Sequence, residues 1–568
     1  MTKMQGAQVL MECLRREGVE VIFGYPGGAN LPIYDALTGA KSIKHILVRH
    51  EQAAAHAADG YARVSGKVGV CFGTSGPGAT NLVTGIANAW MDSVPMVIIT
   101  GAVVSGLIGR DGFQEADITG ITLPITKHNS LVLDPNEIAR AVREAFYLAS
   151  TGRKGPVLVD IPRDVLQQVV EFHWPEKVEI RTYRPTTHGH PAQIKKAAAM
   201  IAESKKPLIL AGHGCVQAQA HDELLAVAEK ADIPVINTLL GLGSFPGSHP
   251  LFMGMPGMHG MYWNNMAICE ADLIIGAGMR FDDRVTGRLK DFAPNARIIH
   301  IDIDPAEIGK NVQTHVPIVG DVKEVLGQLA RYLQPARHEE WVAWFAEMRE
   351  RHPSITIGES ETVLPQFVIK KIYEAMGNDG YVVTGVGQHQ MWAAQFYWSD
   401  KKNGWVTSGG LGTMGFEVPA AMGVQLAFPK DLVWSICGDG GFQMTLQELA
   451  TIVDYELPIK FAIINNASLG MVRQWQELFY AGNISESKQS NPDFVKLAEA
   501  FGMRGLRVTQ QDEVEDAIAE ANRYPGPILI DFQVDKDENV YPMVPPGASL
   551  QETVDLPAIP TMARGVKI

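Results

Sequence analysis

Residues 433–474 read VWSICGDGGFQMTLQELATIVDYELPIKFAIINNASLGMVRQ, and this stretch decides the fold. The apolar run at 433–437 predicts a buried strand, GDGG predicts a turn, 442–455 predicts a helix and 459–464 predicts a second strand. A strand, a helix and a second strand in this order form a unit whose two strands are parallel neighbours. Their carboxyl ends then lie side by side, where open α/β sheets bind ligands.

Polar side chains follow both of these strands. Asp439 comes directly after the first strand, and Asn466 follows the second. A carboxylate and an amide oxygen are hard ligands suited to Mg²⁺. The glycines let backbone N–H groups approach phosphate oxygens, and the following helix points its positive end there. The pattern therefore predicts a magnesium and diphosphate site; the alternative is an ordinary tight turn with an aspartate cap and a solvated asparagine pair.

The rest of the chain alternates between helical and strand patterns in the same style. This alternation predicts an α/β protein of three doubly wound units with mainly parallel sheets. The polar segment at 172–191 predicts a linker, and 339–351 predicts a connecting helix. The predicted units are 1–170, 192–335 and 365–545, followed by a tail at 546–568 that is expected to wrap over a surface or an active site. Further predicted strands lie at 21–24, 45–48, 68–72, 96–100, 157–161, 208–210, 235–237, 273–275, 298–303 and 381–384.

Composition limits the classes of protein that fit. The chain has 568 residues, 46% of them hydrophobic, and a formal net charge of -14. An acidic chain without basic patches argues against nucleic acid as a partner. Five scattered cysteines without metal-site spacing indicate free thiols in a reducing compartment. No signal peptide pattern and no apolar run of membrane-spanning length is found, so we expect a cytoplasmic protein without a membrane partner.

The GDG at 438–440 and the asparagine pair at 465–466 resemble the metal and diphosphate signature of thiamine-diphosphate-dependent enzymes. The resemblance implies Asp439 and Asn466 as side-chain metal ligands and the backbone carbonyl of Ser468 as a third ligand. It also implies that the first unit binds the pyrimidine ring of thiamine diphosphate, that the third binds its diphosphate, and that the two flank a central domain.

Glu51 stands in RHEQ at 49–52, where a predicted strand meets an alanine-rich helix. On position alone it is a first-turn glutamate favoured by the helix dipole. In thiamine enzymes a glutamate at this place holds a proton on the pyrimidine ring, so that the thiazolium carbon can lose its own. A partly buried carboxylic acid suits that role. The resemblance therefore implies Glu51 as the activating acid.

Glycine-rich turns after other predicted strands match further family positions. On their own these are ordinary turns between strand and helix, and Met414 is an ordinary core methionine. The resemblance implies that the N–H of Gly28 faces the reacting carbonyl and that Met414 supports the bent cofactor. The other implied cofactor contacts are Pro77, Asn81, Gly387, Gln388, His389, Gly412, Gly440 and Gly441.

Three stretches narrow the resemblance: FQEAD at 113–117, RFDDRVTG at 280–287 and NNASLGMVRQW at 465–475. Together they resemble the catalytic large subunits of the acetohydroxyacid synthase (acetolactate synthase) family, from about residue 4 to about residue 550. This implies decarboxylation of pyruvate and transfer of the two-carbon unit to a second 2-keto acid, either pyruvate or 2-ketobutyrate, in valine, leucine and isoleucine biosynthesis. It also implies FAD, a homodimer or dimer of dimers, and a separate small regulatory subunit.

The family's flavin contacts fall mainly in the second unit, and the expected flavin role is structural because the reaction has no net redox change. Glycines after the strand at 208–210 suit a pyrophosphate, and acids at strand ends suit ribose hydroxyls. The implied flavin contacts are Arg153, Gly212, Gly214, Thr238, Met258, His259, Gly260, Arg280, Asp302 and Asp321. The implied substrate pocket contains Phe113, Gln114, Met471 and Trp475, of which Trp475 favours the larger acceptor through contact with its extra methyl group.

Three residues depart from the family's usual pattern. Arg163, an implied catalytic-site residue, stands where lysine is usual, Val104 stands where proline is common, and Glu417 stands where glycine is usual. Arginine keeps the charge but changes reach and geometry. A charged side chain at Glu417, close to the diphosphate end, bears directly on cofactor affinity.

Other functions fit parts of the sequence. Another thiamine and FAD enzyme, such as pyruvate oxidase, would consume oxygen and make acetyl phosphate. Glyoxylate carboligase characteristically lacks the glutamate that is present here as Glu51. A catalytically silent flavin-binding subunit is the alternative from a different class, and the presence of Glu51, Asp439 and Asn466 argues against it.

Overall fold

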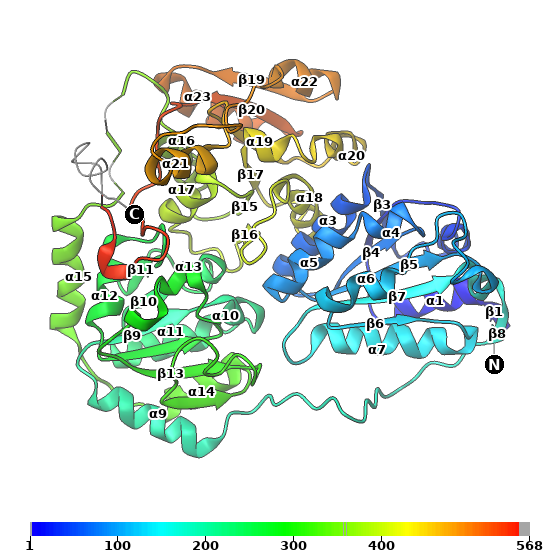
Figure 1. Cartoon of the computed structure of the whole chain (residues 1–568), viewed down its shortest axis with the longest axis horizontal. Helices are drawn as coiled ribbons and strands as arrows, with labels where there is room; N and C mark the ends of the chain where they lie inside the picture. The colour runs from blue at the N-terminus through cyan, green and yellow to red at the C-terminus, as the bar shows by residue number, and fades with distance from the viewer. Residues whose placement is uncertain (1–2, 356, 359, 556–568) are drawn as a thin grey trace.

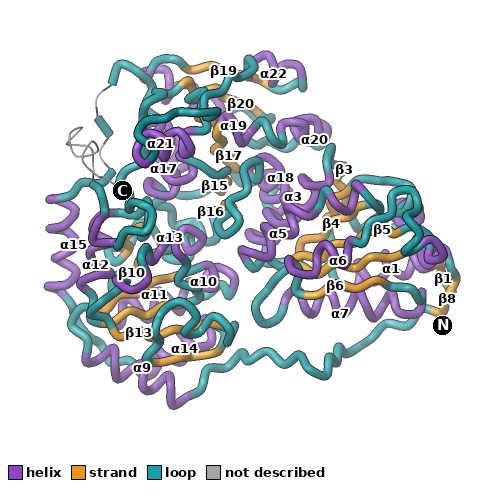
Figure 2. The backbone as a smooth tube through the Cα atoms, in the orientation of Figure 1, coloured by secondary structure: helices purple, strands orange, loops and turns teal. Residues whose placement is uncertain are grey.

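Three six-stranded sheets, each built from parallel neighbours, form the frame of the chain in its computed structural model (Figure 1). The structure describes residues 3–355, 357–358 and 360–555. Helices flank the sheets (Figure 2), and apolar clusters fill the spaces between sheet and helix. The predicted α/β class is therefore confirmed.

The N-terminal unit has the strand order β3-β2-β4-β5-β7-β6, with a small antiparallel pair, β1 and β8, beside it. Its strands are β1 (Lys3–Gln5), β2 (Val21–Gly24), β3 (Lys44–Leu47), β4 (Gly69–Gly73), β5 (Met96–Ala102), β6 (His128–Leu131), β7 (Pro156–Pro162) and β8 (Val169–Glu171). Its helices are α1 (Gly6–Arg16), α2 (Leu31–Leu37), α3 (Glu51–Ser65), α4 (Pro77–Thr80), α5 (Val83–Asp92), α6 (Ile118–Thr122), α7 (Ile138–Ser150) and α8 (Arg163–Gln167).

The central unit has the strand order β11-β10-β9-β12-β13-β14. Its strands are β9 (Pro207–Ala211), β10 (Val235–Asn237), β11 (Phe252–Gly254), β12 (Leu273–Ala277), β13 (Arg297–Asp302) and β14 (Val316–Val319). Its helices are α9 (Pro191–Glu203), α10 (His213–Gln217), α11 (His221–Ala231), α12 (Tyr262–Glu270), α13 (Asp283–Thr286) and α14 (Val322–Tyr332). The predicted connecting helix follows as α15 (Glu339–Arg351).

The C-terminal unit has the strand order β16-β15-β17-β18-β20-β19. Its strands are β15 (Tyr381–Thr384), β16 (Trp405–Thr407), β17 (Val433–Gly438), β18 (Lys460–Asn465), β19 (Arg504–Val508) and β20 (Ile528–Gln533). Its helices are α16 (Pro365–Met376), α17 (Gln388–Phe396), α18 (Glu417–Ala427), α19 (Asp439–Phe442), α20 (Leu449–Asp454), α21 (Gly470–Phe479), α22 (Phe494–Ala500) and α23 (Val514–Arg523).

The two predicted strands of the opening stretch, β17 and β18, are parallel neighbours in the middle of their sheet. Gly438 pairs with Ile464, so the residues that follow both strands emerge next to each other. The apolar residues of both strands are buried, as expected for parallel strands covered on both faces.

The single helix predicted for 442–455 is wrong. The chain forms the short helix α19, then the one-turn helix η6 (Leu446–Glu448) and then α20. The break falls at Thr445, whose hydroxyl donates to the carbonyl of Gly415 at 2.8 Å. This side-chain hydrogen bond competes with the backbone hydrogen bonds of a helix. Hydrophobic periodicity does not detect it, so the predicted helix continued past the break.

Six strands of the three sheets were not predicted: β6, β11, β14, β16, β19 and β20. Five of them lie at a sheet edge, whereas β20 lies between β18 and β19. Edge strands are short and often partly exposed, and β6 and β19 carry polar residues as well. β6 and β19 therefore lack the continuous apolar run by which the central strands were recognised, and β11 and β16 are only three residues long.

The predicted linker at 172–191 runs as an extended connection between β8 and α9 along the bottom of the view (Figure 1). The described part of the predicted tail lies on the central unit, where the Arg288 N–H bonds the carbonyl of Ala548 at 2.9 Å. Just before the tail, the Val544 N–H bonds the carbonyl of Met258 at 2.8 Å. The remainder of the predicted tail, 556–568, lies outside the described residues. Within the described ranges, the structure has no helix that is long and apolar enough to cross a membrane.

The N-terminal and C-terminal units meet through helices α3 and α18, whose backbones approach closely. A Cβ at Gly60 would lie 2.3 Å from the carbonyl oxygen of Ala420, and a Cβ at Gly423 would lie 1.9 Å from that of Ala57. Both distances are far inside van der Waals contact, so each helix needs glycine where the two cross.

Gly423→Ala is therefore expected to destabilise the chain by about 1–3 kcal/mol, the usual cost of overpacking a close contact. Gly327→Ala is the matched control, because Gly327 also lies inside a helix but its added Cβ would come no closer than 3.6 Å to a neighbour. The denaturation midpoints of the cofactor-free chains measure the difference. An unchanged midpoint for Gly423→Ala would mean that the two helices separate at little cost.

Candidate functional site

The predicted site residues follow the carboxyl ends of the strands. In the C-terminal unit Gly387 follows β15, Asp439 follows β17 and Asn466 follows β18. In the N-terminal unit Gly28 follows β2 and Glu51 follows β3. These are the edges at which open α/β sheets bind ligands.

Asp439 and Asn466 lie in a buried polar cluster at neighbouring strand tips. The Asp439 carboxylate accepts a hydrogen bond from the Asn491 amide at 2.7 Å. The Asn466 amide donates to the Gln388 side chain at 3.2 Å, and its oxygen accepts the Ser468 N–H at 3.1 Å. Burial raises the pKa of Asp439 to about 6. A cation beside this carboxyl would favour its charged form.

The described residues contain no group of three or more His, Cys, Asp or Glu side chains that could hold a metal. A cation at these tips would therefore rely on one carboxylate, at Asp439, together with amide and backbone oxygens. An all-oxygen set with a single carboxylate suits Mg²⁺, which keeps several waters, and does not suit Zn²⁺.

Two glycines allow close packing around His389 and Gln489 at the start of α17 and α19. A Cβ at Gly438 would lie 2.8 Å from the His389 ring, and a Cβ at Gly440 would lie 2.8 Å from the Gln489 side chain. Burial lowers the pKa of His389 to about 3, which keeps the ring neutral, and its buried Nε2 has no hydrogen-bond partner. An unpartnered ring nitrogen beside a glycine turn fits an oxygen-rich ligand.

Glu417, the departure noted in the sequence, is fully buried at the first residue of α18. A Cβ at Gly385 would lie 2.5 Å from its carboxyl group, and a Cβ at Gly441 would lie 2.8 Å from it. Neither carboxyl oxygen has a hydrogen-bond partner, and burial raises the pKa of Glu417 to about 7. The Glu417 carboxyl is therefore fully ionised only above neutral pH, because burial disfavours its charged form.

Stability should fall as the pH rises because of this residue. Below 4.5 the Glu417 carboxyl is protonated in both folded and unfolded chains, whereas between 4.5 and about 7 only the folded chain keeps the proton. Stability is therefore lost across this window, by on the order of 3 kcal/mol. We expect Glu417→Gln to remove that loss. Denaturation midpoints of both chains at about pH 5 and about pH 8 measure it, and equal pH dependence in the two would contradict the assignment.

Glu51 is the first residue of α3, and only 8% of its surface is exposed. Its carboxylate accepts the Asn81 amide at 2.9 Å, and a Cβ at Gly78 would lie 3.1 Å from its other oxygen. Pro77 begins the short helix α4 that contains Gly78. The structure thus brings Glu51, Pro77 and Asn81 together in one cluster.

Three other predicted residues of the N-terminal unit, Gly28, Phe113 and Arg163, are open to solvent. A Cβ at Gly28 would meet no atom within 4 Å. Phe113 is 89% exposed. Gln114 has a φ of 59° and lies against Gly76. Arg163 is exposed at the start of α8.

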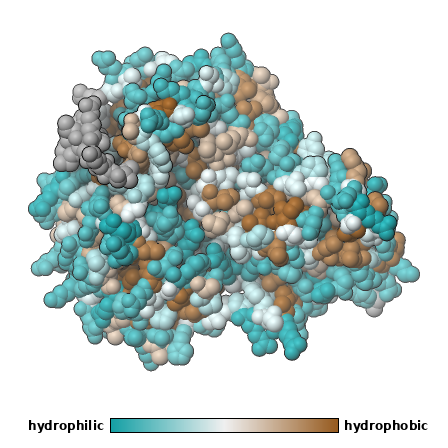
Figure 3. Space-filling model, viewed as in Figure 1, coloured by the Kyte–Doolittle hydropathy of each residue, from teal (hydrophilic) through white to brown (hydrophobic). Residues whose placement is uncertain are grey.

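Apolar side chains gather on the surface of the same unit, as the brown areas of Figure 3 show. Exposed large apolar side chains of this unit lie in the segments that follow β2 and β5, which also carry Gly28, Phe113 and Gln114. An exposed apolar patch of this kind usually marks an interaction surface. The exposed large apolar side chains in these two segments include Tyr25, Leu31, Leu107, Ile108, Phe113, Ile121 and Leu123.

A cavity of about 680 Å³ lies where the three units meet. Among the described residues, neither Glu51 nor Asp439 lines it. Gly212 and Gly260 pack against Gly278 and Pro256, which do line it. The predicted residues on its wall are Arg153, Gly214, Thr238, Met258, His259, Arg280, Asp302, Asp321, Gly387, Gly412, Met414, Met471 and Trp475.

Charged side chains of the cavity wall are held in place by neighbours. Arg153 donates to the Ser93 hydroxyl at 2.9 Å and pairs with Glu307 at 2.8 Å. Asp321 caps the N-terminus of α14. Burial raises the pKa of Asp302, at the end of β13, to about 6. Acids at strand ends are suited to accept hydrogen bonds from sugar hydroxyls.

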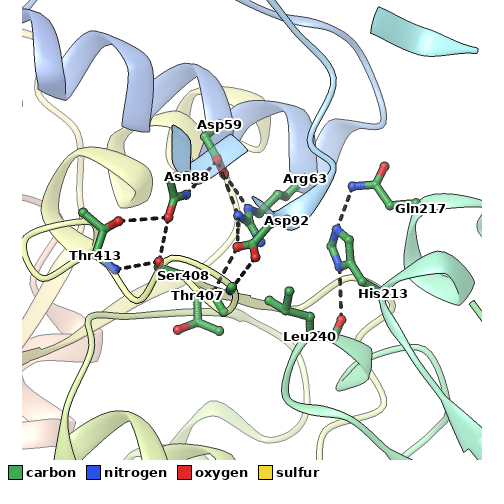
Figure 4. Close-up of polar contacts among 12 residues, drawn as sticks. Asp59, Arg63, Asn88, Asp92, His213, Gln217, Leu240, Thr407, Ser408 and Thr413 are labelled. Carbon is green, nitrogen blue, oxygen red and sulfur yellow. Dashed lines mark hydrogen bonds and ion pairs between the residues drawn. The ribbon is translucent and has the colours of Figure 1, made fainter. Parts of the chain in front are cut away.

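His213 is a wall residue that the sequence prediction missed. One ring nitrogen contacts the Leu240 carbonyl at 3.1 Å and the other contacts Gln217 at 2.7 Å (Figure 4). Desolvation by the surrounding protein lowers the pKa of His213 to about 4. The available signal was its place between two glycines directly after a predicted strand.

A buried ion-pair network holds the loop that precedes Met414 (Figure 4). Arg63 of α3 pairs with Asp92 of α5 at 2.7 Å. The Asp92 carboxylate also accepts the N–H groups of Gly409 at 3.0 Å and Gly410 at 2.6 Å. The N-terminal unit therefore fixes a loop of the C-terminal unit through backbone contacts.

Asn88 extends this network along the same loop (Figure 4). Its side-chain oxygen accepts the Ser408 hydroxyl at 2.6 Å, and its amide donates to Asp59 at 3.0 Å. The Ser408 hydroxyl accepts the Thr413 N–H at 2.8 Å. Sequence reasoning missed these side chains, because a polar residue on an alanine-rich helix gives no sign of its partners.

Comparison with known proteins gives the class. Models of three thiamine pyrophosphate (TPP) enzyme domains match in succession: the N-terminal TPP-binding domain at 4–121, the central domain at 194–329 and the C-terminal TPP-binding domain at 385–532. Three such domains, meeting at one cavity and with polar residues at the strand tips, define a thiamine pyrophosphate enzyme.

Curated relatives narrow the class. The chain is 52% identical over 559 residues to the acetolactate synthase large subunit of Corynebacterium glutamicum, covering 96% of this chain and 89% of that protein. It is 49% identical to a probable acetolactate synthase large subunit of Methanocaldococcus jannaschii, covering 97% and 95%. It is 46% identical to the large subunit of acetolactate synthase isozyme 3 of Escherichia coli, covering 97% and 98%. The chain therefore belongs to the acetolactate synthase large-subunit family.

Proposed function

We propose that the chain decarboxylates pyruvate and transfers the two-carbon unit to a second 2-keto acid, giving acetolactate from pyruvate or 2-aceto-2-hydroxybutyrate from 2-ketobutyrate. The observation that carries this proposal is its 46–52% identity to acetolactate synthase large subunits over 96–97% of the chain. The proposed role is branched-chain amino acid biosynthesis in the cytoplasm. The buried acids Glu51 and Asp439 support an active chain and not a silent subunit.

Thiamine diphosphate and Mg²⁺ fit the tips of β17 and β18. The unpartnered buried nitrogen of His389 favours an oxygen-rich ligand there. The proposed metal ligands are oxygen donors: Asp439, Asn466 and the backbone carbonyl of Ser468. The proposed diphosphate contacts are Gly387, Gln388, His389, Gly440 and Gly441.

Glu51 supplies the proposed acid for the pyrimidine ring. Bound thiamine diphosphate supplies the thiazolium carbon that adds to the keto group and stores the electron pair when carbon dioxide leaves. Glu51 holds a proton at a ring nitrogen, and the amide of Asn81, 2.9 Å away, orients its carboxyl. The open space at Gly28 leaves room for the substrate carbonyl to reach its N–H.

FAD is proposed for the cavity between the three units. About 680 Å³ falls within the usual range of cofactor pockets. Asp302 and Asp321 offer acids for ribose hydroxyls. Gly214 bonds the carbonyl of Gly278 through its N–H at 2.9 Å and thereby holds the turn after β9 against the turn after β12. The proposed flavin role is structural. The apolar side chains of Met471 and Trp475 form the acceptor end of the same cavity.

A second copy of the chain completes the site in this proposal. Glu51 begins α3, whereas Arg63, which braces the loop before Met414, lies roughly 18 Å further along the helix at 1.5 Å per residue. Glu51 therefore lies at the opposite end of α3 from Arg63 and the loop of its own chain that Arg63 holds. The apolar patch that includes Phe113 would be covered by the second copy, bringing Phe113 and Gln114 to its substrate pocket. A dimer or dimer of dimers follows, and a separate small regulatory subunit is a further proposed partner.

Product analysis tests the function. The purified chain is incubated under nitrogen with pyruvate, thiamine diphosphate, Mg²⁺ and FAD, with and without 2-ketobutyrate. Acetolactate, and the mixed product when 2-ketobutyrate is added, are expected. Acetyl phosphate formed only in the presence of oxygen would indicate a pyruvate oxidase instead, and a failure to release carbon dioxide would indicate a silent subunit.

A further inference from the structure

Glu448 of η6 is fully buried and reaches from the C-terminal unit into the N-terminal unit. Its carboxylate accepts the N–H of Arg49 at 2.9 Å and 3.1 Å and the N–H of His50 at 3.1 Å. These two amides directly precede Glu51. A carboxylate of one unit thus holds the backbone from which the proposed activating acid of the other unit projects.

The two amides have no partner within helix α3 itself. His50 is the N-cap of α3, and its ring accepts the Gln52 N–H at 3.2 Å. The N–H groups at and before an N-cap point away from the helix and need an outside acceptor. Glu448 is that acceptor for both, and loss of one of its acceptor oxygens would leave part-buried donors poorly satisfied.

The carboxylate is itself fixed in one orientation. The Thr451 hydroxyl, which is fully buried, donates to the second oxygen of Glu448 at 2.8 Å. The Leu47 N–H, on the strand side of the same turn, bonds the Tyr455 hydroxyl at 2.9 Å. The turn from β3 into α3 is therefore held by side chains of the C-terminal unit at several successive points.

We propose that Glu448 is a positioning residue for Glu51: it fixes the first turn of α3 and thereby the direction from which the Glu51 carboxyl meets the pyrimidine ring. The inference rests on the proposed function, since it deepens the role given to Glu51. The reverse arrangement, in which Asp92 accepts the N–H groups of Gly409 and Gly410, shows the same use of a buried carboxylate between the units.

In the alternative explanation, Glu448 only joins the two units and does not position Glu51. Glu448→Gln keeps the size of the side chain but turns one acceptor into a donor. Thr451→Val leaves the carboxylate and removes the bond that orients it, and it carries the test if Glu448→Gln does not fold. Asp454→Asn is the matched control, because Asp454 pairs with the side chain of Arg49 and not with its backbone.

The first measurement uses the cofactor-free chain. Amide hydrogen exchange at Arg49 and His50 should be slow in the wild type and should speed up roughly tenfold or more in Glu448→Gln, because one of the two acceptor oxygens is replaced by a donor. Thr451→Val should show a smaller increase. Asp454→Asn should match the wild type.

The second measurement uses the chain loaded with thiamine diphosphate and Mg²⁺. Exchange of the cofactor's C2 proton with deuterium reports how well Glu51 activates it. We expect Glu448→Gln to slow this exchange roughly tenfold or more, while the pyruvate KM and the cofactor affinity change little and kcat falls. A residue that only joins the units would not move C2 exchange at constant cofactor affinity.

A wild-type rate of C2 exchange in Glu448→Gln would overturn the inference. If amide exchange at Arg49 and His50 becomes faster in that variant while C2 exchange does not become slower, Glu448 only joins the two units. If Glu448→Gln does not fold, wild-type C2 exchange in Thr451→Val overturns it. These outcomes are distinct from failure of the proposed function, in which the wild-type chain itself forms no acetolactate.

Discussion

Replacing Glu51 by glutamine is expected to lower acetolactate formation by roughly a hundredfold to ten-thousandfold, the range that a positioned acid or base contributes. Glutamine keeps the size and the bond from Asn81 but cannot share a proton with a ring nitrogen. The decrease in activity should appear in kcat, because the cluster of Glu51, Pro77 and Asn81 does not line the cavity. Steady-state kinetics with pyruvate and C2 proton exchange of the bound cofactor measure the effect.

Glu339→Gln is the matched control for this change. Glu339 is also the first residue of a helix, α15, but it is exposed and distant in sequence from every predicted site residue. It should keep wild-type kinetics, since only a surface charge is altered. Near-normal acetolactate formation by Glu51→Gln would refute the role proposed for Glu51.

Asp439→Asn is expected to lower activity by more than roughly a hundredfold at low Mg²⁺, since even residues that support a metal ligand contribute ten- to hundredfold. Asparagine keeps the shape but removes the only carboxylate among the proposed metal ligands. The metal-free fold should survive, because burial already raises the pKa of Asp439 to about 6 and disfavours its charge. Mg²⁺-dependent binding of thiamine diphosphate, followed by protein fluorescence, gives a readout that does not depend on turnover.

Asp134→Asn is a suitable control, because Asp134 caps a short helix on the exposed surface of the N-terminal unit. Wild-type Mg²⁺ dependence in Asp439→Asn would exclude Asp439 as a ligand.

The same two variants test the proposed pairing of chains. Mixed dimers of Glu51→Gln and Asp439→Asn should each contain one intact site, so random mixing of two inactive proteins should restore roughly a quarter of wild-type activity. If each site is built from a single chain, no activity returns. This outcome separates the pairing of chains from the chemistry of the residues.

The sequence predicted most of the inner strands and the residues at their carboxyl ends, because fully buried parallel strands are continuous apolar runs and ligands bind where such strands end. The inner strand β20 was not predicted. The prediction failed where structure depends on contacts between distant segments. Thr445 interrupts a predicted helix through its bond to Gly415, and the edge strands lack an apolar run. The roles of Glu448 and Asp92 depend on backbone groups in another unit, which no local pattern specifies.

Glu417 shows the limit of reading a charge from a sequence. Its carboxyl suggested an added negative charge near the diphosphate. The structure shows a fully buried carboxyl, without a hydrogen-bond partner, in a space left by Gly385 and Gly441. Whether such a group is charged depends on its desolvation, which only the packed structure reveals.

Helix α3 has a consequence for how two paired chains would work. Its first residue would serve one reaction centre, while its last turn braces the loop of the other. A tilt or axial shift of α3 would change both reaction centres. A destabilising substitution in the middle of this helix should therefore lower turnover at both centres together. Communication between the centres would then require no separate relay.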